Sequence, residues 1–432
     1  MRDPARRSLP AQWFATGLRR RLAPLRLLVG TGLCLLLCLP LGMPAAALAL
    51  SDAQQLVVEA WRLVNQSYVD PAQLEAVQWR RLRQKTLEQP ISSSLEAYAA
   101  IEAMLAPIDD PYTRMLRPEE FATLRSSTQG RVTGVGLQLG RRAGDQRIVV
   151  IAPLDASPAA DAGIASGTEI LRVDGTPAEE LGLEGTAARL RGPAGSDVLV
   201  ALRAPSGQES EVLLDRREVD LQPVRSHRLL SDGHSLGYLR ITQFSEPVPQ
   251  QVRSALAVLS APGGGVPIEG LILDLRNNSG GLVAAGLAVA DGLLDGDPIV
   301  ETQDRGGIAD RQQAGPGQLY GGPLLTLVNA GTASASEILA GALQDSGRSR
   351  LAGSRTFGKG LIQTLINLSD GSGLAVTVAR YLTPSGRDIQ NQGIEPDVLL
   401  SQPEPLEPDG DGDSWLQEAA RLLVAGLAAP AP

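Results

Sequence analysis

Two residues in the last third of the chain have side chains that together can cleave an acyl bond, Ser334 and Lys359. Only two of the 39 basic residues are lysine, and Lys359 lies between two glycines. Arginine stays protonated, whereas a buried lysine can lose its proton and act as a base. Lys359 is therefore a candidate base, and Ser334 is a candidate nucleophile for it.

The residues before Ser334 predict the element that positions it. An apolar run over 323–328 ends in a Gly-Thr turn, and a helical pattern starts near Ser334, which predicts strand, tight turn and helix. A hydroxyl at such a helix start lies among free amide donors, near the positive end of the helix dipole. Ser334 and Glu337 also match a capping box, in which the hydroxyl only caps the helix. Thr332 and Ser336 are further hydroxyls nearby in the sequence, so the nucleophile stays open at this point.

A phosphate-binding loop is another alternative, because Gly353, Gly358 and Lys359 match most of that motif. The residue after the lysine is Gly360, where the motif needs a serine or threonine to hold magnesium. The segment 361–368 has the pattern of a strand instead of the required helix. These two departures exclude a nucleotide site here.

The segment 334–363 resembles the carboxyl-terminal processing (tail-specific) peptidases, serine proteases with a Ser-Lys dyad. It has their Ser-Ala-Ser-Glu helix start and their Thr-Phe-Gly-Lys-Gly-x-x-Gln motif without a gap. The resemblance implies that Ser334 is the nucleophile and Lys359 the general base. It also implies supporting roles for Glu337 and for Gln363, which would orient the lysine. Only the match in spacing to Lys359 selects Ser334 over the two neighbouring hydroxyls.

Two further stretches match the same family. Residues 271–281 read Leu-Ile-Leu-Asp-Leu-Arg-Asn-Asn-Ser-Gly-Gly, and the resemblance implies that the N–H groups of Gly280 and Ala335 are the two oxyanion donors. A glycine turn without a catalytic role is the alternative for this stretch. Asp109 and Asp110 open a family landmark, Asp-Asp-Pro-Tyr-Thr, and for their carboxylates turn capping is favoured over catalysis.

Short strand patterns separated by glycine turns run from about 130 to 215. Their order resembles a PDZ domain, in which an extended peptide adds as a strand and loop amides hold its terminal carboxylate. The resemblance implies a peptide-binding loop of four residues, whose glycines let the backbone approach the ligand closely. These residues are Gly134, Val135, Gly136 and Leu137. A plain β-bulge fits the two glycines equally well, and the Gly-x-x-Ile-Leu-x-Val-Asp-Gly stretch carries the PDZ assignment.

The chain is long enough, at 432 residues, for two or three domains. Strands alternating with helices after 218 predict a mixed α/β core, within a multidomain α/β (α+β) fold. The resemblance implies a core of the ClpP/crotonase type. The segment 303–320 is glycine-rich and polar, which predicts a loop near the site. The expected parts are a signal peptide at 1–49, an N-terminal helical region at 50–118, a PDZ domain at 119–217, a protease core at 218–400 and a tail helix within 401–432.

The first 49 residues differ from the rest of the chain. They hold seven arginines and one acid, and an apolar run over 27–41 precedes a small-residue cleavage site. This pattern is typical of a secretory signal peptide cleaved near Ala49, with an uncleaved anchor as the alternative. Cys34 and Cys38 lie in the apolar run, so the mature chain would have no cysteine for disulfides, thiolate catalysis or zinc. The expected location is the periplasm or the thylakoid lumen.

Several other classes of protein are disfavoured. The net charge of −9 becomes more negative without the leader, which argues against a nucleic-acid binder. His227 and His234 lie in a polar stretch and favour surface histidines over a Ser-His-Asp triad. Asp409, Asp411 and Asp413 lack the glycine and glutamate of a calcium loop, so a solvated linker capping the last helix is favoured. No metal, nucleotide or other cofactor is expected.

The sequence therefore predicts a serine endopeptidase that binds the carboxyl terminus of a protein through a PDZ domain and removes a C-terminal extension. Residues 276–282 and 356–363 resemble the cyanobacterial and chloroplast-lumen branch of the family. That branch trims the precursor of a photosystem II reaction-centre subunit. The alternatives are a general periplasmic or lumenal tail-specific quality-control protease, and a non-catalytic PDZ scaffold. Expected partners are proteins with exposed tails, including membrane-associated ones.

Overall fold

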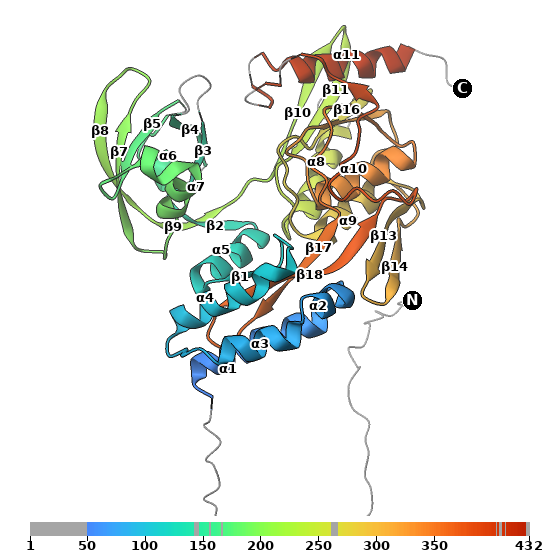
Figure 1. Cartoon of the computed structure of the whole chain (residues 1–432). Coiled ribbons are helices and arrows are strands. Elements are labelled where there is room, and N and C mark those ends of the chain that lie inside the picture. The colour runs from blue at the N-terminus through green and yellow to red at the C-terminus, as the bar shows by residue number, and fades with distance from the viewer. Residues whose placement is uncertain are drawn as a thin grey trace, which may run out of the picture. The chain divides into compact units, whose positions relative to one another are not determined.

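The computed structural model describes residues 50–428 except 142–146, 155–156, 166, 261–266, 403, 406–407 and 411 (Figure 1). The predicted signal peptide and Asp411 of the tail therefore lie outside the described residues. Within the described ranges, no helix is both long and apolar enough to cross a membrane.

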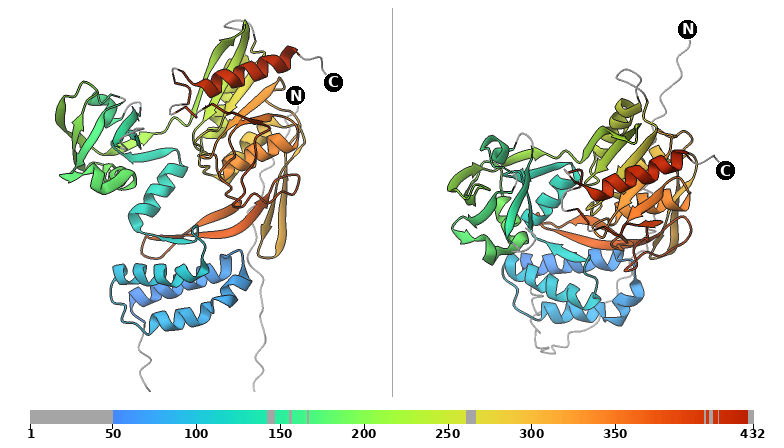
Figure 2. Two further views of the ribbon diagram at one scale, coloured as in Figure 1. Left: turned by 45° about the horizontal axis from the view of Figure 1, so that its top comes forward. Right: turned by 90° about the horizontal axis from the view of Figure 1, so that it is seen from above.

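The N-terminal part of the described chain is helical, and polar side chains start its helices. Ser51 and Ser93 each open a capping box, and Asp70 accepts two backbone N–H groups ahead of Pro71. The apolar faces of the first and fourth helices pack against strand β18, so that this region is anchored to a sheet (Figure 2). The helices are α1 (Asp52–Ser67), α2 (Pro71–Ala76), α3 (Trp79–Leu87), α4 (Ser94–Leu105), the short 3₁₀ helix η1 (Ala106–Ile108) and α5 (Pro118–Thr128).

That sheet is antiparallel throughout, in the order β1-β18-β13-β14, with β17 also paired to β18. Its strands are β1 (Arg114–Leu116), β13 (Pro298–Asp304), β14 (Gly307–Gln313), β17 (Leu361–Asn367) and β18 (Gly373–Leu382). The prediction of a loop over 303–320 is wrong for the first part of this segment, where β13 and β14 form a hairpin. The glycines there make the hairpin turn, in which Gly307 has a φ of +110°.

The next part is a β domain with its own apolar core. Its main sheet has the order β3-β4-β5-β7-β8, so β3 is an edge strand. The longer of its two helices, α7, starts at Ala178 and has a break at Gly182. The elements are β2 (Arg131–Gly134), β3 (Leu137–Arg141), β4 (Ile148–Pro153), α6 (Pro158–Asp161), β5 (Glu169–Val173), β6 (Thr176–Pro177), α7 (Ala178–Leu190), β7 (Asp197–Arg203), β8 (Glu209–Asp215) and β9 (Arg217–Asp220).

The last part is built on a six-stranded sheet in the order β10-β11-β12-β15-β16-β19. The first pair is antiparallel and the others are parallel. Its strands are β10 (Val224–Ser231), β11 (His234–Ile241), β12 (Gly270–Asp274), β15 (Leu324–Val328), β16 (Arg350–Gly353) and β19 (Val398–Leu399). The helices are α8 (Val248–Ser260), α9 (Val283–Leu293), α10 (Ala335–Asp345) and α11 (Ser414–Ala428).

Helices cover both faces of this sheet, as parallel strands require. Leu271 and Leu273 of β12 face the cluster formed with α8, α9 and α10, whereas Ile272 faces α11. The segments that follow β12, β15 and β16 leave the sheet at one edge, because carboxyl ends of parallel strands meet there. The fold thereby gathers the three segments that carry Gly280, Ser334 and Lys359.

A matched pair of leucines tests how much α10 contributes to stability. Leu339 is fully buried in α10, whereas Leu95 of α4 is 67% exposed. We expect Leu339→Ala to lower the free energy of unfolding by about 2–5 kcal/mol, because it leaves a cavity in the core. Leu95→Ala should change it by less than about 0.5 kcal/mol. Calorimetric melting of both variants checks this, and equal midpoints would contradict the packing described.

Candidate active site

Ser334 lies directly ahead of α10, beside the loop that follows β12. A Cβ added to Gly280 would lie 2.9 Å from the Cβ of Ser334 and 3.1 Å from the nitrogen of Ala335. Real Cβ atoms do not approach that closely, so a glycine is needed at this position. The loop and the start of the helix are therefore packed backbone against backbone.

The backbone of Ser334 has an unusual conformation, with φ 57° and ψ −120°. A non-glycine residue with positive φ is strained, and such strain is typical of functional sites and of serines at sharp strand-to-helix turns. The side chain makes no cap hydrogen bond, since the N–H of Glu337 donates to the carbonyl oxygen of Ser334 at 2.8 Å. The capping alternative therefore does not account for the hydroxyl.

The two neighbouring hydroxyls have structural partners. Thr332 Oγ1 donates to the carbonyl oxygen of Leu275 at 2.9 Å, and Ser336 Oγ donates to that of Asn278 at 2.9 Å. Both side chains are fully buried. Ser334 is thus the hydroxyl of the three that is left without such a bond in the described structure.

Glu337 joins the serine segment to the lysine segment. Its Oε2 atom accepts the backbone N–H of Ser334 at 2.9 Å and that of Lys359 at 2.9 Å. Its Oε1 atom accepts the hydroxyl of Thr356 at 2.5 Å and the N–H of Gly358 at 2.8 Å. The carboxylate is fully buried, so these four donors replace its hydration. Sequence reasoning gave Glu337 only an unspecified supporting role.

Lys359 has surroundings that favour a neutral amine. Its Nζ atom lies 4.7 Å from the ring centroid of Tyr112. Burial, together with the positive charge of Arg114, lowers the pKa of Lys359, while Asp110 and Glu337 act in the opposite direction. Desolvation is the largest of these effects, and the net direction suits a lysine that acts as a base.

Among the hydrogen bonds of the described residues, none joins Ser334 Oγ to Lys359 Nζ. Gln363, which was expected to orient the lysine, makes no such bond either, and its buried Nε2 atom lacks a hydrogen-bond partner. The structure thus links Ser334 and Lys359 through their backbone N–H groups, which both bind the Glu337 carboxylate. The side chain of Lys359 is directed to Tyr112.

The Asp-Asp-Pro-Tyr-Thr turn has the capping role expected of it. Asp110 accepts the N–H of Tyr112 at 2.9 Å and the hydroxyl of Thr113 at 2.7 Å. The oxygen of Thr113 in turn accepts the N–H of Thr377 in β18 at 3.0 Å. This turn carries Tyr112 to the lysine, a contact that the sequence reasoning missed. The family landmark was the one signal that could have pointed to it.

The two expected oxyanion donors differ in this structure. The N–H of Gly280 donates to Asn278 Oδ1 at 2.9 Å, so in this conformation it does not face a substrate. Asn278 is held in place by its own Nδ2 atom, which donates to the carbonyl oxygen of Ile241 at 2.9 Å. The N–H of Ala335 has no acceptor among the described residues, as expected at the first position of a helix.

The predicted peptide-binding loop connects β2 to β3. Gly136 has a φ of +74°, and a Cβ added there would lie 2.1 Å from the Cβ of Ser157. The carbonyl oxygen of Gly136 accepts the N–H of Leu154 at 2.8 Å, and that of Val135 accepts the N–H of Ala159 at 3.0 Å. These bonds fix the loop after Gly134.

Leu137 begins β3, which is an edge strand of the sheet formed by the described residues. Helix α7 packs near this strand. An edge strand beside a helix is the arrangement to which an extended peptide adds in PDZ domains.

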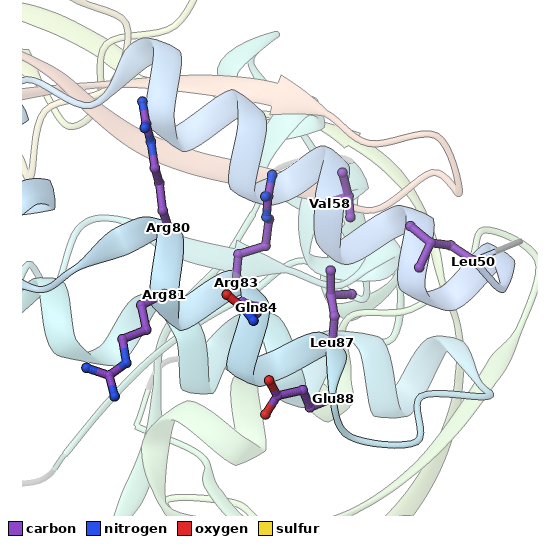
Figure 3. A pocket seen from close by; sticks show the side chains of 8 residues that line it. All are labelled: Leu50, Val58, Arg80, Arg81, Arg83, Gln84, Leu87 and Glu88. Atoms are coloured by element: carbon purple, nitrogen blue, oxygen red, sulfur yellow. The ribbon is translucent and has the colours of Figure 1, made fainter. Parts of the chain in front are cut away.

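A groove of about 810 Å³ lies away from these residues, between α1 and α3 (Figure 3). Figure 3 shows Leu87 of α3 pointing toward Val58 of α1, with arginines of α3 farther along the groove. Its lining holds neither a hydroxyl nor a paired base, and it takes no part in the site around Ser334. It is lined by Leu50, Val58, Arg80, Arg81, Arg83, Gln84, Leu87 and Glu88.

The histidines and the acidic tail have structural partners. His227 Nε2 lies 3.4 Å from Asp409 Oδ1, and His234 Nδ1 lies 2.8 Å from Glu269 Oε2. The prediction of a solvated linker is wrong for Asp413. This residue is 3% exposed, because it pairs with the buried Arg276. No group of three possible metal ligands gathers within the described residues.

Comparison with known proteins defines the class to which this arrangement belongs. Residues 235–400 match the peptidase family S41 model, and residues 123–203 match the PDZ domain model. The chain belongs to peptidase family S41 and is a serine peptidase of the carboxyl-terminal-processing type with a PDZ domain. The expected multidomain α/β (α+β) fold is thereby confirmed.

Named relatives give the same assignment. A carboxyl-terminal-processing protease of Synechocystis sp. is 44% identical over 394 residues, which cover 90% of this chain and 91% of that protein. A chloroplastic C-terminal processing peptidase of Tetradesmus obliquus is 43% identical, covering 85% and 82%. A solved structure titled photosystem II D1 C-terminal processing protease has a TM-score of 0.60 and 41% identity, covering 87% of this chain and 98% of that one.

Proposed function

We propose that this peptidase removes the carboxyl-terminal extension of a protein precursor with Ser334 as nucleophile and Lys359 as general base. The observation that carries the assignment is the buried carboxylate of Glu337, whose Oε2 atom binds the N–H of both residues. A single rigid acceptor thus sets the positions of two residues that are far apart in the sequence.

The chemistry follows from these positions. The Lys359 side chain turns from Tyr112 to Ser334 and, as a neutral amine, takes the hydroxyl proton while Ser334 attacks the peptide carbonyl. The proton passes to the leaving amine, and water then hydrolyses the acyl-enzyme. The Ala335 N–H binds the oxyanion, and Gly280 joins it once its N–H leaves Asn278. Loss of one oxyanion donor costs a factor of about 10² to 10³ in rate in other proteases.

The β domain selects the substrate in this proposal. A carboxyl-terminal tail adds as a strand to the free edge of β3, and the N–H groups of the Gly134–Leu137 loop hold its terminal carboxylate. Support comes from the close packing of Gly136 on Ser157, which orients the loop. A tail bound there is extended, as a peptidase requires of its substrate.

The substrate we favour is the precursor of the photosystem II D1 subunit, a membrane-associated protein. Support comes from the name of the structural relative and from chloroplastic and cyanobacterial relatives. The leader, cleaved near Ala49, would export the enzyme to the thylakoid lumen or the periplasm. A general quality-control protease would instead accept unrelated tails.

Incubation of the mature chain with two substrates tests the proposal. One substrate carries the D1 precursor tail, and the other carries an unrelated unstructured tail of equal length. Mass spectrometry should find one released fragment from the first, none with Ser334→Ala, and at most slow cleavage of the second. Equal cleavage of both tails would favour quality control, and no cleavage of either would contradict the assigned residues.

The charges around Lys359 predict opposite pH effects for two variants. Arg114→Gln removes a charge that lowers the pKa of Lys359, so the rise of kcat/KM with pH should move to higher pH. Asp110→Asn removes a charge that raises this pKa, so the rise should move to lower pH. Arg80→Gln, in α3, is the control and should leave the profile in place. Movement of both profiles in the same direction would refute the base role.

A further inference from the structure

We propose that the described part of the C-terminal segment, residues 404–405, 408–410 and 412–428, positions the active-site loops, with Glu404 and Asp413 as its positioning residues. This inference rests on the proposed function. Two backbone segments would be positioned in this way. They are the glycine loop, residues 276–281, and the nucleophile turn, residues 329–332. The segment bonds to both, at the edge of the sheet where they meet.

Arg276 begins the glycine loop and is fully buried. Its Nη2 atom donates to Asp274 Oδ2 at 2.6 Å and to Asp413 Oδ2 at 2.6 Å, and its Nη1 atom donates to Asp413 Oδ1 at 3.0 Å. A bidentate carboxylate fixes both the distance and the plane of a guanidinium group. One of the two carboxylates that hold Arg276 therefore comes from the C-terminal segment.

Asp413 is itself held by the segment. Its Oδ1 atom accepts the N–H of Leu416 in the first turn of α11 at 2.9 Å, and its Oδ2 atom accepts the N–H of Asp409 at 2.8 Å. Helix α11 packs on the sheet through Ala419, Ala420 and Leu423. The position of the carboxylate is thus set by a packed helix, which makes it a firm support for Arg276.

Glu404 acts on the nucleophile turn through Asn329. The Nδ2 atom of Asn329 donates to Glu404 Oε1 and, at 2.7 Å, to Asn277 Oδ1. The Oδ1 atom of Asn329 accepts the N–H of Asn277 at 2.8 Å and that of Gly331 at 3.1 Å. Asn329 therefore spans both loops, and Glu404 fixes which way its amide faces.

Loss of these supports should affect catalysis more than binding. The glycine loop carries Gly280 and the nucleophile turn leads into Ser334, and a displacement of about 1 Å at a catalytic group costs roughly 10² in rate. The proposed peptide-binding residues are in the β domain, so substrate affinity should change little. This separates a positioning role from general destabilisation.

The test compares full-length mature variants in cleavage kinetics and hydrogen exchange. We expect Glu404→Ala and Asp413→Asn each to lower kcat about 10-fold or more, with KM within about 3-fold of wild type. Amides of the glycine loop and nucleophile turn should exchange faster in both variants. Glu404→Gln keeps an oxygen acceptor for the Asn329 amide, so its kcat should stay close to that of the wild type.

Leu56→Ala in α1 is the matched control, because it weakens the packing of a different apolar cluster and leaves the C-terminal segment unchanged. It should lower the melting midpoint and leave kcat within about 2-fold. Unchanged kcat and unchanged exchange in Glu404→Ala would overturn the inference, even if Asp413→Asn fails to fold. An inactive wild-type chain would contradict the proposed function, whereas the exchange data would still decide whether the segment orders the two loops.

Discussion

Lys359→Arg is expected to abolish cleavage as completely as Lys359→Ala, and Ser334→Ala is expected to be equally inactive. Arginine keeps the positive charge but cannot become a neutral base near neutral pH. The surroundings of Lys359 lower its pKa by burial, which has no useful effect on a guanidinium group. The expected loss in kcat is about 10⁴-fold or more, because nucleophile and base act as a unit.

Lys85 provides the control for this experiment. It is the other lysine of the chain and lies exposed on α3. Lys85→Arg should retain wild-type activity in the same mass-spectrometric assay. Cleavage by Lys359→Arg at a rate near that of Lys85→Arg would show that the amine is not the base.

The second large loss of kcat is expected from the variant Glu337→Gln. The glutamine has one acceptor oxygen and an NH₂ group, which would face two of the four donors now bound by the carboxylate. Those donors would be left buried and unsatisfied, at a cost of about 1–3 kcal/mol each. We expect kcat to fall by roughly 10²-fold, because Ser334 and Lys359 lose the shared acceptor that fixes the positions of their backbones.

Glu96→Gln is the matched control, since Glu96 has the same capping-box position at the start of α4. It should change Tm only slightly and leave kcat unchanged, because Glu96 caps its helix at an exposed position. A catalytic loss no larger in Glu337→Gln than in Glu96→Gln would reduce Glu337 to an ordinary helix cap. Tm and kcat measured together distinguish these results.

The elements around Ser334 were predictable because their signals are local. An apolar run and a capping-box pattern within about fifteen residues define β15, the turn and α10. The contact between Tyr112 and Lys359 was not predictable in this way. It depends on β1 and β17 both pairing with β18, and no local pattern encodes such a long-range pairing.

The orientation of side chains and the burial of charged groups were also not predictable from the sequence. Gly280 lies beside Ser334 in the structure, but nothing in the residue types shows that Asn278 accepts its N–H. Asp413 lies in an acidic, glycine-rich stretch that is typical of solvent-exposed chain. It is buried because Arg276, distant in sequence, needs a second carboxylate.

The position of Lys359 over Tyr112 allows the proposed base to be observed by NMR spectroscopy. Aromatic ring currents move the resonances of nuclei held above the ring, so the ε-methylene signal of Lys359 is displaced from that of exposed Lys85. Isotope labelling of lysine alone yields two side-chain signals, since the chain has two lysines. The protonation of the amine can then be followed directly, and loss of the displacement on adding substrate would report the turn of the side chain toward Ser334.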